Sequence, residues 1–143
     1  NKERIKHAEK GLENTRFIYG DALRENKLSP DVIIMSHVLH HLRSEDEQEK
    51  LIKDCIGKLR RGGKLIILEI KPSFSLEYLV TVFVDYTIYP MLFEKRIIGS
   101  KVYYRKGTEW VNLLSGLGLK VRKEEVTGKP FSHMILLAEK IKI

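Results

Sequence analysis

Three histidines, His37, His40 and His41, lie close together and are the side chains in this sequence best suited to chemistry. Histidine changes its charge near neutral pH, so it can take up a proton, and it is also a common metal ligand. His37 and His41 are four residues apart, a spacing that can put two ligands on one face of a helix. A metal site needs a further ligand in a matching place, and none is evident. We therefore predict no metal site.

The segment that presents these histidines begins at Asp31, runs through apolar residues and closes at Ser36. Continuous apolar strands of this kind are typical of a parallel sheet covered on both faces. In such sheets, ligands bind outside the carboxyl ends of the strands. The sequence therefore predicts a strand over residues 31–36 that carries Ser36 and the histidine-rich turn to the rim of a site.

Two further motifs accompany this strand. Gly20-Asp21-Ala22 follows an expected strand over residues 15–19, and residues 59–69 read Leu-Arg-Arg-Gly-Gly-Lys-Leu-Ile-Ile-Leu-Glu. In order and spacing, the three motifs resemble class I S-adenosylmethionine-dependent methyltransferases that act on small molecules. The resemblance runs over nearly the whole chain. It implies an α/β fold, a Rossmann-like doubly wound and mostly parallel sheet that ends in an antiparallel strand pair. It also implies S-adenosylmethionine as cofactor.

The resemblance also implies where the cofactor binds. Asp21 would meet the adenine amino group, with Gly20 and Ala22 beside it, and Ser36 and His37 would border the same pocket. A carboxylate can accept a hydrogen bond from an exocyclic amine. The alternative reading of Asp21 is a turn or N-cap aspartate.

His40 is the candidate catalytic residue, as the general base that deprotonates a methyl acceptor. The run Leu39-His40-His41-Leu42 resembles the histidine-bearing segment of small-molecule O-methyltransferases. That family continues with Asp-Trp, whereas His41-Leu42 stands here, which weakens the O-methyl reading. The alternative is that His40 only lines the pocket or caps the following helix. We interpret His133, alone in an expected strand, as structural.

Residues 73–100 are strongly apolar but are interrupted by Glu77, Asp85 and the helix breaker Pro90. The interruptions argue against a membrane span. In the resembled family, an insertion here forms a lid over the acceptor, and the other interpretations are extra core or a dimer contact. Under the lid interpretation, Tyr86, Tyr89 and Phe93 contact the substrate.

Periodicity predicts the remaining elements. A helix over residues 44–61 has Ser44 and Glu47 as a capping box, Cys55 on its apolar face and Gly62-Gly63 at its end. Residues 64–70 read as a strand, and Thr108 as the cap of a last helix that contains Trp110. Residues 119–126 and 133–140 read as two strands joined by a hairpin turn. A short amphipathic helix is expected over residues 2–10.

The glycine-rich loop and acidic strand end of the resembled family have no match in this sequence. Three functional classes stay open: a small-molecule methyltransferase, an inactive methyltransferase-like binding or assembly module, and another nucleotide-binding α/β protein. The family strand order is third, second, first, fourth, fifth, seventh, sixth. Without the first two strands, a gap of about 10 Å would separate residues 15–19 from residues 31–36. We therefore expect one of two outcomes: residues 1–21 pack in a position that differs from the family, or a second copy fills the gap or pairs the exposed edges in a homo-oligomer.

Composition bounds the remaining classes. The chain has 143 residues, of which 43% are hydrophobic and 31% charged, as expected for one globular domain over residues 1–143. The single Cys55 excludes an internal disulfide. No secretory signal is visible, so we expect a cytoplasmic protein. The net charge of +7 comes without a long basic block, so we expect no nucleic-acid partner.

Overall fold

The computed structural model describes residues 13–15, 20–21, 24, 29–94, 102–126 and 132–141. Its strands are β1 (Val32–Ser36), β2 (Lys64–Ile70), β3 (Leu119–Val126) and β4 (His133–Lys140). Its α-helices are α2 (Glu45–Lys58), α3 (Leu76–Phe83) and α4 (Gly107–Gly116). A 3₁₀ turn, η1 (Leu39–His41), and two π-helical segments, η2 (Val84–Ile88) and η3 (Pro90–Glu94), complete the described elements. The expected helix over residues 2–10 and strand over residues 15–19 lie largely or wholly outside the described residues.

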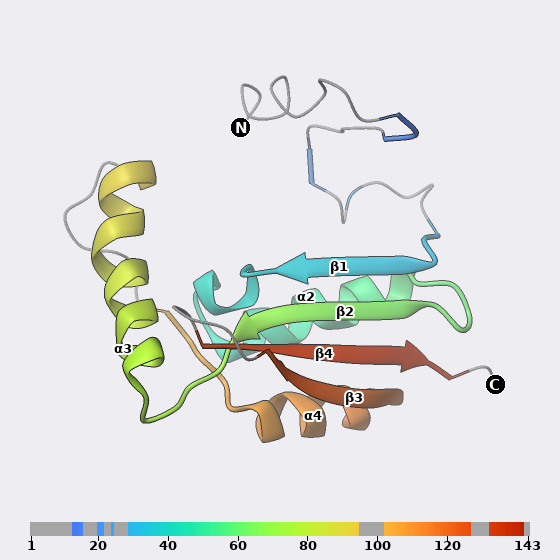
Figure 1. Cartoon of the computed structure of the whole chain (residues 1–143). Helices are drawn as coiled ribbons and strands as arrows, with labels where there is room; N and C mark the ends of the chain where they lie inside the picture. Colours follow the sequence, from blue (N-terminus) through green and yellow to red (C-terminus); the bar gives the residue numbers. More distant parts are fainter. Residues whose placement is uncertain are drawn as a thin grey trace.

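The four described strands form one sheet in the order β1-β2-β4-β3. β1 pairs with β2 in parallel, whereas β4 runs antiparallel to both β2 and β3. Of the four described strands, three therefore share one direction and β4 opposes them (Figure 1). This order is the fourth, fifth, seventh, sixth arrangement predicted for the C-terminal part of the sheet. The mixed sheet with an antiparallel C-terminal pair is thus confirmed.

One face of the sheet carries the core. The register aligns Met35, Ile67 and Leu136 side by side, and all three are buried. They pack in one cluster with Ile52 and Cys55 of α2 and with residues of α4. Burying a side chain of this size contributes about 1.5–3 kcal/mol. The placement of Cys55 in the core is therefore confirmed.

The opposite face differs from the expectation of a sheet covered on both sides. Ile34 is 68% exposed and Val32 is 44% exposed, and Ile34 aligns with Ile66 of β2 and then Leu137 of β4. Among the described residues, both helices that share the core lie on the Met35 face. β1 therefore alternates between a buried and an open side although residues 32–35 are all apolar.

Local hydrogen bonds fix the N-termini of α2 and α4, the two helices that cover the core. The Ser44 hydroxyl accepts a hydrogen bond from the Glu47 amide at 3.2 Å, but the Glu47 carboxylate reaches the Arg43 amide, so only half of the predicted capping box forms. α4 begins one residue before the predicted cap Thr108. Lys106 is its N-cap, and the Lys106 amide donates to the Glu109 carboxylate at 2.7 Å.

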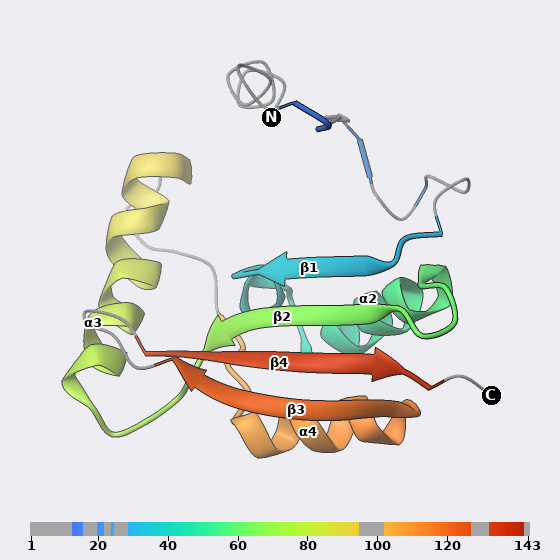
Figure 2. The same ribbon diagram turned by 45° about the vertical axis from the view of Figure 1, so that its right-hand side comes forward.

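α3, η2 and η3 form one helical ribbon that stands across the end of the sheet where β1 and β2 finish (Figures 1 and 2). Ser75 caps its beginning, where the hydroxyl accepts a hydrogen bond from the Tyr78 amide. Pro90 does not break the ribbon as predicted, since it begins the second π-helical segment. Among the described residues, no helix combines the length and the apolar character that a bilayer-spanning segment needs.

Candidate functional site

The chain turns sharply where β1 ends. His37 has a φ of 53°, in the left-handed region that residues other than glycine seldom adopt, and such a conformation costs on the order of 1–3 kcal/mol. Its amide still donates to the Leu68 carbonyl at 3.0 Å, which extends the pairing of β1 with β2. The 3₁₀ turn η1 follows at once and carries Leu39, His40 and His41. Ser36 and His37 thus lie at the carboxyl end of β1, as predicted.

The carboxylate of Glu69 joins β2 to this turn. Oε1 accepts the Leu39 amide at 2.8 Å, and Oε2 lies 2.5 Å from Nδ1 of His40. Glu69 and His40 are each 2% exposed, and a buried carboxylate is tolerated only with such partners. Because an ionised carboxylate can only accept, this contact places a hydrogen on Nδ1. Nε2 of His40 is therefore the nitrogen directed away from Glu69.

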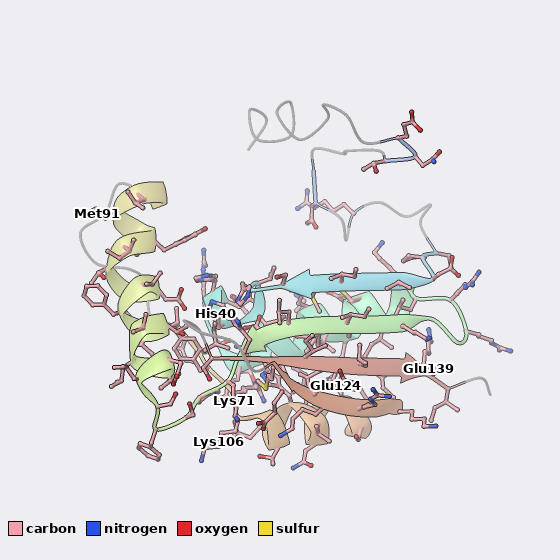
Figure 3. The ribbon with its side chains drawn as sticks, viewed as in Figure 1. His40, Lys71, Met91, Lys106, Glu124 and Glu139 are labelled. Atoms are coloured by element: carbon pink, nitrogen blue, oxygen red, sulfur yellow. The ribbon has the colours of Figure 1, made fainter. Side chains whose placement is uncertain are left out.

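Asp85 approaches His40 from the helical ribbon. Its Oδ2 lies 3.6 Å from Nε2 of His40 and accepts a hydrogen bond from the Tyr104 hydroxyl at 2.7 Å. Asp85 is on the π-helical segment η2, and π-helical turns occur often at functional sites. Burial, and then the hydrogen bond to Asp85, raises the pKa of Tyr104, so its phenol stays a donor. Figure 3 shows His40 between the end of the sheet and α3.

Further aromatic rings lie around His40 and its neighbours in the turn. The rings of His40 and His41 lie 4.1 Å apart, and His41 stacks on Tyr89 at 5.4 Å. On the other side, His37 meets the ring of His133 at 4.8 Å. Burial lowers the pKa of both His37 and His133, which favours neutral imidazoles there.

A second polar group holds the turn from behind. The amide of Gln48, on α2, donates to the carbonyl oxygens of Leu39 and Tyr103 at 3.0 and 2.8 Å. Its own oxygen accepts a hydrogen bond from Nε of Arg105 at 2.7 Å. The guanidinium of Arg105 lies 5.3 Å above the ring of Trp110, a cation–π distance. Gln48 is fully buried, so η1 is fixed from both sides.

The structure gathers some predicted site residues and leaves others apart. Tyr86 and Tyr89 both lie on the ribbon. Tyr89 stacks on His41 of the turn, whereas the Tyr86 hydroxyl is 3.5 Å from the Val102 amide. Gly20 and Asp21 are exposed, and Asp21 pairs with Arg24. The described blue segments that include them lie apart from the sheet, beyond β1 (Figure 1). Ala22 and the side chain of Phe93 lie outside the described residues.

Three residues of the site escaped sequence reasoning: Glu69, Asp85 and Tyr104. The first had a signal, since an acidic residue near the end of an apolar strand marks the ligand-binding edge. Asp85 was noticed only as an interruption in an apolar segment. Tyr104 had no signal, because its partner Asp85 is brought to it only by the fold.

Comparison with known proteins identifies the fold that carries these residues. Residues 1–67 match the family model described as a methyltransferase domain. The chain superposes on human N-acetylserotonin methyltransferase with a TM-score of 0.66 at 20% identity, covering 95% of this chain and 36% of that one. The chain has a methyltransferase fold.

Two other solved structures agree with this fold. One is magnesium protoporphyrin IX methyltransferase from Synechocystis PCC 6803, at a TM-score of 0.59 and 16% identity, with 97% of this chain and 52% of that one covered. Another is an O-methyltransferase family protein from Burkholderia thailandensis, at a TM-score of 0.57 and 16% identity, with 82% and 32% covered. This methyltransferase-like chain therefore spans about a third to a half of the length of these proteins. No curated protein gives a significant match to the sequence.

Proposed function

We propose that the chain takes part in S-adenosylmethionine-dependent methyl transfer to a hydroxyl of a small-molecule acceptor, with His40 as the general base. The observation that carries this proposal is the pair formed by His40 and Glu69 at the carboxyl end of the sheet. Supporting it are the resemblance to methyltransferases and the solved neighbours with bound S-adenosylmethionine or S-adenosylhomocysteine.

The proposed reaction is a direct displacement. The acceptor oxygen forms a bond to the methyl carbon while the carbon–sulfur bond of the sulfonium breaks, and the sulfur keeps the electron pair. Nε2 of His40 takes the hydroxyl proton. The imidazolium that results lies between two carboxylates, Glu69 on Nδ1 and Asp85 at 3.6 Å from Nε2. Such preorganised charges stabilise the ion that the reaction creates.

The helical ribbon is the proposed lid. Asp85 and Tyr89 lie on it and reach His40 and His41 of the turn, so its movement would open and close access to the buried His40. The ribbon also exposes the apolar side chains of Leu76, Leu79, Phe83 and Met91, and Met91 is labelled in Figure 3. Together with the exposed Ile34, they support the proposed homo-oligomer, since large exposed apolar patches mark interaction surfaces. A cytoplasmic location stays a prediction.

The cofactor is tested by titrating the chain with S-adenosylhomocysteine in a calorimeter. We expect saturable binding that Asp21→Asn weakens about tenfold, since a hydrogen bond to a charged group contributes about 1.5–3 kcal/mol. Glu124→Gln, a carboxylate change on β3 (Figure 3), is the matched control and should bind as the wild type does. No saturable binding up to millimolar ligand would contradict the cofactor assignment.

The base is tested by His40→Asn. Transfer of a radiolabelled methyl group to a panel of phenols and hydroxyindoles should fall about 10²-fold, whereas S-adenosylhomocysteine affinity should not change. His133→Gln, a histidine outside the reacting geometry, is the control. A loss below about threefold at saturating acceptor would leave His40 as a wall of the pocket.

A further inference from the structure

His40, His41 and Asp85 bring three ligand atoms together. The two imidazoles and the carboxylate each offer one atom, and these atoms all lie within 4.8 Å of one another. Nε2 of His40 is 3.6 Å from Oδ2 of Asp85. Ligand atoms around a tetrahedral zinc ion are about 3.4 Å apart, because zinc–nitrogen and zinc–oxygen bonds are about 2.0–2.1 Å long. We propose that these three residues bind a divalent transition-metal ion, with Zn²⁺ as the best match.

The surroundings of the ligands support this site. Metal-binding histidines almost always donate their other ring N–H to a carboxylate or carbonyl oxygen, which fixes the ring and its tautomer. His40 has this arrangement, since Oε2 of Glu69 accepts a hydrogen bond from Nδ1 at 2.5 Å and Nε2 is directed toward Asp85. The Asp85 carboxylate is oriented in turn by the Tyr104 hydroxyl at 2.7 Å. Two of the three ligands therefore already have a supporting partner.

The donor set also indicates the class of metal. Two imidazole nitrogens and one carboxylate oxygen suit zinc and its first-row neighbours rather than magnesium or calcium, which prefer oxygen ligands. Three protein ligands leave a fourth position for water or another oxygen, as in catalytic zinc sites. His41 is the exposed member of the three, so its side chain can adjust the remaining distance without repacking the core.

This site differs from the one that histidine spacing suggested. The sequence pointed to His37 and His41 on one helix face and offered no third ligand. The structure instead combines His40 and His41 of the 3₁₀ turn with Asp85 of η2. His37 precedes the turn in a left-handed conformation. Nε2 of His40 has one lone pair, so it cannot bind the ion and take the acceptor proton at the same time, and the metal-bound form excludes the proposed general-base role. The inference does not rest on the proposed methyl transfer, because metal binding can be measured without cofactor or acceptor.

The test uses the whole chain without an affinity tag, freed of metal with a chelator. Zn²⁺ is titrated in competition with a chromophoric chelator, and Co²⁺ is added separately to record its visible absorption. We expect one equivalent of Zn²⁺ per chain and a tetrahedral Co²⁺ spectrum. His41→Gln and Asp85→Asn each remove a ligand and should weaken Zn²⁺ binding more than about 100-fold, whereas Tyr104→Phe should weaken it about tenfold, because losing a supporting partner costs about 10–100-fold.

The control is His133→Gln, which removes a nearby histidine that is not among the three ligands. It should leave the affinity and the Co²⁺ spectrum unchanged. Circular dichroism in the presence of the chelator checks that each variant is folded. If His41→Gln or Asp85→Asn is unfolded, His41→Asn or Asp85→Ser is used in its place. The proposal is overturned if the chain binds no stoichiometric Zn²⁺, or if folded His41 and Asp85 variants bind it as tightly as the wild type.

Discussion

Two polar groups hold the turn η1, and they differ in whether the buried side chain that contacts the turn can carry a charge. The titratable cluster consists of Glu69, His40, Asp85 and Tyr104, and the amide clamp consists of Gln48 and Arg105. Glu69 is 2% exposed and Gln48 is fully buried, so burial does not distinguish the two groups. In the amide clamp, a neutral amide with two donor hydrogens meets two backbone carbonyl oxygens. The amide itself carries no charge, although its oxygen accepts a hydrogen bond from the charged guanidinium of Arg105.

The titratable cluster is the more costly of the two. Removing a carboxylate from water carries a penalty of several kcal/mol, which good partner geometry offsets only in part. Such groups are found most often where a protein moves protons or binds ions. The comparison teaches that a buried amide such as Gln48 can hold the turn without this penalty. The carboxylates and histidines therefore point to chemistry at this end of the sheet.

The largest effect is expected for Glu69→Ala. It leaves the Leu39 amide and Nδ1 of His40 without their buried partner, and breaking a buried pair in this way costs about 3–5 kcal/mol. Urea unfolding measures the loss of free energy. Glu69→Gln keeps an acceptor for the Leu39 amide and should lose less. A loss below about 1 kcal/mol for the alanine variant would mean that the cluster is not a support of the fold.

The sequence predicted the elements better than it predicted the two polar groups. β1, β2 and α2 carry their own signals, since apolar runs and helical periodicity depend on neighbouring residues. The strand order was predicted from the family resemblance, because local sequence patterns do not determine which strands are neighbours. Gln48, by contrast, lies in the run Glu45-Asp46-Glu47-Gln48-Glu49, which is typical of a solvated helix start.

The reason for this failure is tertiary. Gln48 is buried because the backbone at Tyr103 and the side chain of Arg105 cover it, and neither contact is visible in a linear sequence. The same holds for Asp85, whose partner Tyr104 is 19 residues away. His40 was predicted as a site residue because histidine, by its residue type alone, can take up a proton near neutral pH.

Gln48→Ala should have the next largest effect. It removes two donors to backbone carbonyls and the acceptor for Arg105. Each buried group left unpaired costs about 1–3 kcal/mol, partly relieved by entering water, so we expect a total loss of about 2–3 kcal/mol in urea unfolding. Lys50→Ala, an exposed change on the same helix, should stay within about 0.5 kcal/mol. Equal losses for the two variants would show that the amide clamp contributes nothing.

Tyr104→Phe is expected to cost about 1 kcal/mol, the net contribution of one hydrogen bond. The phenol donates to Asp85, and burial keeps its pKa raised, so the bond should persist throughout the neutral pH range. A double-mutant cycle with Asp85→Asn isolates the pair. The coupling energy should be close to the single loss of Tyr104→Phe, and a coupling near zero would remove Tyr104 from the titratable cluster.

The smallest effect depends on pH and concerns His133, whose ring meets that of His37 beside the titratable cluster. Burial is the main cause of the lowered pKa of His133, and the neighbouring His37 adds to it, whereas Asp85 and Glu69 oppose it. A histidine whose pKa is lower in the folded state than its ordinary 6.5 favours folding fully above that pH. Its contribution is lost as the pH falls below 6.5, because the unfolded chain then binds more protons.

We therefore expect the free energy of unfolding to fall less steeply from pH 7.5 to pH 5 in His133→Gln than in the wild type. The measurement is urea unfolding in a buffer that contains a chelator. Gln48→Ala should keep the wild-type slope, since an amide has no proton to gain in this range. If His133→Gln kept the full wild-type slope, the charge would have to be taken up elsewhere in the chain. The pH dependence would then no longer distinguish the end of the sheet that carries the histidines from the amide clamp behind it.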